Sequence, residues 1–152
     1  MDSYKIKLII LKENNIIKTL EEIIGQKAVY LNDWNTFDDM VNDFQDYCDR
    51  DKENEEYSGV NVVLASYSYE CYSGEAFVLF EENGKLYEIN ASHCSCYGLE
   101  GQWSPEEVDL KELEHRLLNG SFGEDSYSEN NFKQTLCNLL GVEYKKNMIG
   151  GW

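Results

Sequence analysis

The pattern of hydrophobic and polar positions along the chain predicts strands in several short stretches. From 4 to 11, apolar residues occupy every second position with lysines between them, which is the period of a strand. The runs 60–69, 76–80 and 85–89 are rich in β-branched and aromatic residues, which favour strands. The shorter run 28–31 is also apolar and predicts one further, brief strand.

Asn83 and Gly84 separate the last two long runs, and this dipeptide is the strongest short signal for a two-residue β-hairpin. A turn of that length fixes the register of the two strands, because it decides which residues lie opposite each other. Apolar pairs then share one face, and a pair of opposite charges flanks the turn. The expected pairs are Glu82 with Lys85, Phe80 with Tyr87, and Val78 with Ile89.

Apolar residues repeat at helical spacing in four other stretches, each of which carries an end signal. The first stretch ends at Gly25, which is expected to stop the helix in the left-handed conformation. Thr36 and Asp39 resemble a capping box at the start of the second helix. Ser104, followed by proline and two glutamates, is expected to cap the third helix, and Ser128 the fourth.

These elements together predict a single α+β domain over residues 1–152, with a small antiparallel sheet, a central Asn-Gly hairpin and about four helices packed on it. A chain of 152 residues, 42% of them hydrophobic, has the size of one ordinary domain. The apolar run near the N-terminus is too short to span a bilayer and lacks the features of a secretory signal. Together with an odd number of cysteines, five, these features favour a cytoplasmic location.

The net charge is the strongest global signal in the sequence. The chain has 29 acidic and 13 basic residues, a formal net charge of −16, which argues against direct binding to nucleic acid or to a membrane. Acidity of this kind also serves solubility alone, but acidic residues gathered from 38 to 56, with tyrosines in the β-rich run that follows, favour a basic protein partner. The expected partner-binding residues are Asp39, Asp43, Asp46, Asp49, Glu53, Tyr67, Tyr69 and Tyr72.

The stretch 90–103, with the sequence NASHCSCYGLEGQW, is the most unusual part of the chain. It places a histidine, two cysteines and two glycines between an expected strand and an expected helix. We interpret it first as a packed connection that closes the sheet onto the third helix. The expected packing anchors are Tyr97, Leu99 and Trp103, and Gly98 and Gly101 permit positive φ.

His93, Cys94 and Cys96 leave two chemical alternatives open. Imidazole and thiolate are ligands that zinc prefers, but this spacing is poor for one tetrahedral ion, and distant segments would have to complete the shell. A thiol enzyme would use Cys94 or Cys96 as nucleophile and a histidine as base, but nearby carboxylates are expected to raise the thiol pKa. We therefore predict no metal, no cofactor and no catalytic residue.

The run HCSCYGLEGQWSPEE, with GEAFVLFEENGKLYEI before it, resembles a family of small, uncharacterised acidic proteins encoded in bacteriophages and prophages. The resemblance implies a phage-type genomic setting and brings no known activity. By functional analogy alone, it suggests an inhibitor of a host defence, of the anti-CRISPR kind, that docks on a basic nucleic-acid-handling protein. An immunity protein to a nuclease toxin is a rival within the same class of binding proteins.

Overall fold

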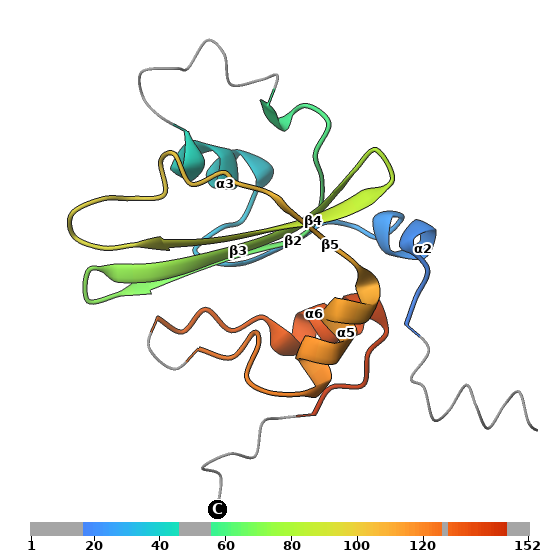
Figure 1. The fold of residues 1–152 in the computed structure, drawn as a ribbon. Helices are drawn as coiled ribbons and strands as arrows, with labels where there is room; N and C mark the ends of the chain where they lie inside the picture. The colour runs from blue at the N-terminus through green and yellow to red at the C-terminus, as the bar shows by residue number, and fades with distance from the viewer. Residues whose placement is uncertain (1–16, 46–55, 126–127, 146–152) are drawn as a thin grey trace, which may run out of the picture.

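The computed structural model describes residues 17–45, 56–125 and 128–145. These residues form a five-stranded sheet with the order β1-β2-β3-β4-β5, and helices cover both of its faces (Figure 1). The predicted α+β class is therefore confirmed, whereas the strand expected at 4–11 lies outside the described residues. The helices are α2 (Leu20–Ile24), α3 (Phe37–Phe44), α5 (Leu110–Leu118) and α6 (Lys133–Leu140), and the strands are β1 (Val29–Asn32), β2 (Asn61–Glu70), β3 (Ser73–Glu82), β4 (Lys85–His93) and β5 (Glu106–Val108).

Within the described sheet, β1 is the strand that runs parallel to its neighbour. Val29 lies opposite Leu64 of β2, and the chain between these two strands passes through α3. A parallel pair requires such a crossover, because both strands must enter the sheet from the same end. The antiparallel arrangement expected from the sequence is therefore correct for β2 to β5 and wrong for β1.

β3 and β4 are joined at Asn83 and Gly84. Both residues have positive φ, 54° and 82°, as a type I′ turn requires. The Glu81 carboxylate accepts a hydrogen bond of 3.0 Å from the Gly84 N–H, which ties the turn to the strand before it. The register of the two strands places Glu82 opposite Lys85, Phe80 opposite Tyr87, and Val78 opposite Ile89, the pairs that the sequence indicates.

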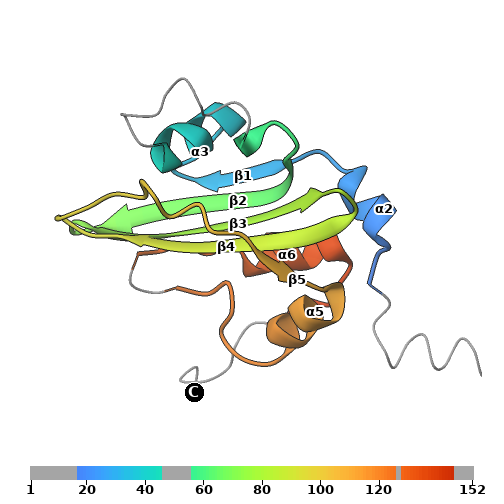
Figure 2. The same ribbon diagram turned by 45° about the horizontal axis from the view of Figure 1, so that its top comes forward.

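Two apolar cores lie on the two faces of the sheet. α2, α5 and α6 contribute to the first core, and α3 with the connection after β4 contributes to the second (Figure 2). Along β3, Phe77 and Leu79 belong to the first core, whereas Val78 and Phe80 belong to the second. Because both faces are covered, this strand has a continuous apolar run in the sequence instead of an alternating one.

Thr36 begins α3 with the capping box that the sequence indicates. The Thr36 side chain accepts a hydrogen bond from the Asp39 N–H, and the Asp39 carboxylate accepts one from the Thr36 N–H. After α2, by contrast, Gly25 has a φ of −77° and lies in the right-handed region. The left-handed stop expected there is wrong, because the Gly25 N–H still bonds the Glu21 carbonyl, at 3.1 Å, as in a continuing helical turn.

The helix expected to begin at Ser104 begins later in the chain. Residues 106–108 form β5 instead, and Val108 lies opposite Leu86 of β4 in the first core. This pairing joins β5 to β4 and buries the Val108 side chain in the first core. The N-cap of α5 is Asp109, whose carboxylate accepts a hydrogen bond of 2.7 Å from the third helical residue.

α6 begins without a side-chain cap, so the expectation that Ser128 caps this helix is wrong. The Gly123 carbonyl accepts hydrogen bonds from the N–H groups of Phe132, at 2.9 Å, and Lys133, at 3.1 Å. The Ser128 hydroxyl instead donates a hydrogen bond to Asp125 Oδ2. Ser128 is buried, and its carbonyl accepts a hydrogen bond from the Ser68 hydroxyl of β2.

Candidate functional site

The acidic residues of α3 have structural partners. Asp39 closes the capping box, and Asp43 Oδ2 accepts a hydrogen bond of 2.7 Å from the indole Nε1 of the buried Trp34. Both carboxylates therefore help to hold the fold, and the acidic partner surface expected around α3 stays a prediction. The other acidic residues expected in it, Asp46, Asp49 and Glu53, lie outside the described residues.

The three tyrosines expected to bind a partner differ in exposure. Tyr69 is 55% exposed and Tyr72 is 79% exposed, whereas Tyr67 is 7% exposed. Tyr67 belongs to the second core, where the Trp34 ring meets it edge-on with 5.2 Å between centroids. The expectation that Tyr67 presents its ring to a partner is therefore wrong.

Tyr72 belongs to a turn that the hydrophobic pattern does not reveal. Cys71 and Tyr72 join β2 to β3, and both have positive φ, 52° and 70°. Left-handed backbone in bulky residues costs roughly 1–3 kcal/mol each, and an observed outlier of this kind is a reason to look for function nearby. The turn holds both side chains exposed at the tip of the hairpin.

Tyr67, Tyr69 and His93 form a set of contacting rings on one face of the sheet, which we call the tyrosine–histidine cluster. The ring centroids are 5.4 Å apart for Tyr69 and His93, 5.9 Å for Tyr67 and Tyr69, and 6.0 Å for Tyr67 and His93. Gly74 of β3 lies opposite both Tyr69 and His93. A Cβ at Gly74 would lie 2.4 Å from the Tyr69 Cβ, so the glycine leaves the space over which the two rings meet.

The charges of three carboxylates act on the titration of Tyr67. Burial is the largest cause that raises the pKa of Tyr67 to about 12, and the charges of Asp43, Asp33 and Glu100 act in the same direction. The Asp33 N–H donates a 2.7 Å hydrogen bond to the Tyr67 carbonyl, and Asp43 binds the Trp34 indole that packs on Tyr67. The tyrosine–histidine cluster therefore lies in a negative electrostatic field.

A tight turn begins the connection 93–103. Cys94 and Tyr97 exchange two backbone hydrogen bonds, of 3.1 and 3.3 Å. Tyr97 is 56% exposed and is not the packing anchor expected, because it ends this turn instead of lying over the core. Both glycines of this connection permit positive φ, and Gly101 adopts it, with a φ of 78°, whereas Gly98 does not.

The rest of this connection packs on the sheet, as expected. Leu99 is buried, and Gln102 holds the loop against the end of β4. Gln102 Nε2 donates to the carbonyls of Ser92 and Gly98, both at 2.7 Å, and its Oε1 accepts from the Ser92 N–H at 3.0 Å. No pattern in the sequence marks Gln102, because its hydrogen bonds to Ser92 form only when the loop folds back on β4. The rings that contact Trp103 are those of Phe44, Tyr57 and Phe80.

Free thiols lie at the same end of the sheet. Cys71, Cys94 and Cys96 are at least partly exposed. The Cys96 N–H donates to Cys94 Sγ over 3.4 Å, and this contact is the largest cause that lowers the pKa of the Cys94 thiol. The expected rise of this pKa is therefore wrong, because backbone donors of the turn stabilise the thiolate at contact distance.

The described residues give no support to a zinc site, or to a thiol enzyme, that combines His93 with the thiols. The His93 ring packs edge-on against Tyr69, with 5.4 Å between the ring centroids. Nδ1 of His93 is buried and has no hydrogen-bond partner in the described chain. Within the same residues, no group of three or more histidine, cysteine, aspartate or glutamate side chains is placed to hold a metal ion, the set His93, Cys94 and Cys96 included.

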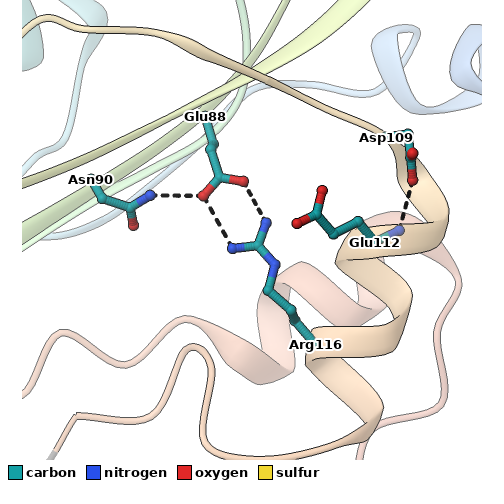
Figure 3. A network of polar contacts seen from close by, with 5 residues as sticks. All are labelled: Glu88, Asn90, Asp109, Glu112 and Arg116. Atoms are coloured by element: carbon teal, nitrogen blue, oxygen red, sulfur yellow. Dashed lines mark hydrogen bonds and ion pairs between the residues drawn. The ribbon is translucent and has the colours of Figure 1, made fainter.

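The opposite face of the sheet carries a polar network between β4 and α5 (Figure 3). Arg116 of α5 makes two hydrogen bonds to the Glu88 carboxylate of β4, one of them 3.1 Å long. Asn90 Nδ2 donates to Glu88 at 2.7 Å, and the Arg116 guanidinium carbon lies 4.5 Å from the centroid of the Phe122 ring. Because the two charges neutralise each other, we interpret this network as a structural link between α5 and the sheet.

A hollow of about 370 Å³ lies elsewhere, along the outer side of α3. Its lining includes one charged side chain, that of Asp38. It reaches Gln45 and Tyr57, which flank a part of the chain outside the described residues.

Comparison of the chain with known protein families, with curated proteins and with solved structures finds no match. The resemblance to small phage proteins therefore stays a prediction, and the function has to be argued from geometry. Within the described residues, no helix is long and apolar enough to cross a membrane.

Proposed function

We propose that this protein is a non-enzymatic binding protein that docks one acidic, tyrosine-bearing end of its sheet on a basic protein partner. The observation that carries the proposal is the exposure of Tyr69, Tyr72 and Tyr97, which together define the tyrosine end. The β2–β3 turn and the turn after β4 lie side by side there in both views (Figures 1 and 2). Tyrosine is enriched in interfaces, because it supplies a large contact area at low entropic cost.

The charge around the tyrosine end favours a basic partner. Glu70, Glu75 and Glu100 are exposed in the elements that meet there. From 53 to 110, the only lysine or arginine in the sequence is Lys85, which lies at the opposite end of β4. Attraction between this end and a lysine- and arginine-rich surface would speed association and exclude acidic partners.

The partner class that we propose is a nucleic-acid-handling protein. Such proteins line their binding channels with lysine and arginine, which contact the phosphate backbone. A chain with a net charge of −16 and exposed aromatic side chains is complementary to a surface of that kind. The resemblance to phage proteins adds the prediction that the partner serves a host defence, while an immunity protein would use the same chemistry against a nuclease toxin.

Site-specific photo-crosslinking in cells tests this proposal. A photoreactive residue at Tyr72 is expected to capture a basic protein, whereas the same residue at Lys111, exposed on α5 across the sheet, is not. Binding of the captured protein is expected to weaken several-fold as salt rises above physiological strength, where the Debye length falls below about 8 Å. Equal capture at both positions, or binding that salt leaves unchanged, would contradict the proposal.

A second candidate function is that Cys94 acts as a nucleophile. The Cys96 N–H that donates to its sulfur, and the lowered pKa of its thiol, favour this candidate. Alkylation by iodoacetamide across a pH series, read for each cysteine by mass spectrometry, is expected to give Cys94 a lower midpoint in the folded protein than in urea. The sign follows from the N–H donors, which stabilise the thiolate only while the turn is folded, so the thiolate is populated at lower pH. The same midpoint in both states would remove this candidate.

A further inference from the structure

The tyrosine–histidine cluster presents aromatic surface to solvent. Tyr69 contacts both of the other rings edge-on and is nevertheless 55% exposed. Tyr67 is 7% exposed, so the accessible aromatic surface of the cluster is that of Tyr69 and of the partly exposed His93. Aromatic faces carry a negative quadrupole that attracts cations placed within about 6 Å of the ring centroid.

Three exposed carboxylates accompany these rings. Asp33 follows the end of β1 and is bonded through its backbone to Tyr67, and Asp43 is fixed by its hydrogen bond to Trp34. Glu100 follows the buried Leu99 in the connection that covers the same face. No hydrogen bond within the described chain engages the carboxylate of Asp33 or of Glu100.

One buried polar group of the cluster has unmet hydrogen-bonding capacity. Nδ1 of His93 is buried and has no hydrogen-bond partner within the described residues. Buried polar groups nearly always have a partner, so this nitrogen is a reason to look for a ligand at the cluster.

We propose that the tyrosine–histidine cluster is the receptor for an arginine side chain of the partner, an inference that rests on the proposed function and names its recognition chemistry. A guanidinium group is planar, stacks on aromatic faces and carries five N–H donors, which suits exposed rings and carboxylates together. A lysine ammonium is a compact, strongly hydrated charge and matches this combination less well.

Titration of the full chain with N-acetyl-argininamide, followed by NMR of the ring protons, tests the receptor. Saturable shifts of His93 and Tyr69 are expected, with a Kd of about 1–10 mM for so small a probe. N-acetyl-citrullinamide, which has nearly the same shape and no charge, is expected to give no saturable shift. N-acetyl-lysinamide is expected to bind at least threefold more weakly than the arginine probe.

Matched tyrosine variants show whether the cluster is responsible. Tyr69→Ala is expected to weaken argininamide binding at least fivefold, because it removes the exposed ring of the cluster. Tyr144→Ala, at another exposed tyrosine beyond α6, is expected to leave binding unchanged. Any one of three results would overturn the receptor. These are the absence of saturable shifts, equal binding of the citrulline or lysine probe, and equal effects of the two variants.

The two proposals fail in distinguishable ways. If crosslinking at Tyr72 captures a basic protein but argininamide does not bind, the binding function stands and the arginine receptor is overturned. If argininamide binds at the cluster but crosslinking at Tyr72 captures no basic protein, the receptor stands and the proposed function is overturned.

Discussion

Replacing Arg116 with methionine is expected to lower the free energy of unfolding by about 2–4 kcal/mol. The methionine keeps most of the apolar stem but leaves the Glu88 carboxylate, whose side chain is 9% exposed, without its charge partner. The loss is expected to be smaller than for a fully enclosed ion pair, because 29% of the Arg116 side chain is exposed. Denaturant unfolding followed by circular dichroism measures the change.

Two further variants separate the ion pair from general effects on α5. Lys111→Met, at an exposed position of the same helix, is expected to change stability by no more than about 0.5 kcal/mol. Arg116→Met combined with Glu88→Leu is expected to recover much of the loss, because no unpaired charge then remains. A loss below about 1 kcal/mol for Arg116→Met alone would show that the network contributes little to stability.

Gly123→Ala is expected to destabilise the domain by about 2–5 kcal/mol, through backbone strain and overpacking together. Gly123 has a φ of 84°, and a Cβ there would lie 2.9 Å from the backbone N and Cα of Lys133. The Gly123 carbonyl also accepts the first hydrogen bonds of α6, so relief of the clash would loosen the start of that helix. Thermal and denaturant unfolding of the purified variant measure the loss.

Gly101→Ala is the matched control for this variant. Gly101 has a similar φ, 78°, but a Cβ there meets nothing within 4 Å. Its replacement is therefore expected to lower the free energy of unfolding only through backbone strain, by about 1 kcal/mol. Equal losses in the two variants would show that the close approach to Lys133 is unimportant.

Local chemistry explains which parts of the fold the sequence predicts well. Asn83 and Gly84 adopt positive φ at little cost, and the two-residue turn then fixes every pair between β3 and β4. Thr36 and Asp39 likewise act within one helical turn, so their capping box can be recognised without knowledge of the tertiary structure. Sequence signals that act within one turn can be recognised without knowledge of a distant partner.

The start of α5 shows where local chemistry is ambiguous. Ser104 and Asp109 are each followed three residues later by a glutamate, so both satisfy the pattern of a helix cap. Burial of Val108 beside Leu86 selects the later cap, and this burial exists only in the assembled sheet. The parallel docking of β1 depends on the tertiary structure in the same way.

The tyrosine–histidine cluster could not be predicted from sequence for a related reason. Gly74 meets Tyr69 and His93 only when three strands are in register, and each partner lies on a different strand. Tyr67 and Tyr69 share a face in the alternating pattern, but the packing around α3 and Trp34 buries only Tyr67. Which tyrosine a partner can reach is therefore a property of the packed layers.

Strand length bears on how this protein behaves when it is concentrated. The inner strands β2, β3 and β4 have ten, ten and nine residues, whereas β1 and β5, at the edges of the described sheet, have four and three. Unpaired backbone groups at a sheet edge are the template on which another molecule adds a strand, and short edges offer few of them. The long apolar strands are thus shielded from aggregation, and a partner at the tyrosine end meets side chains instead of an open edge.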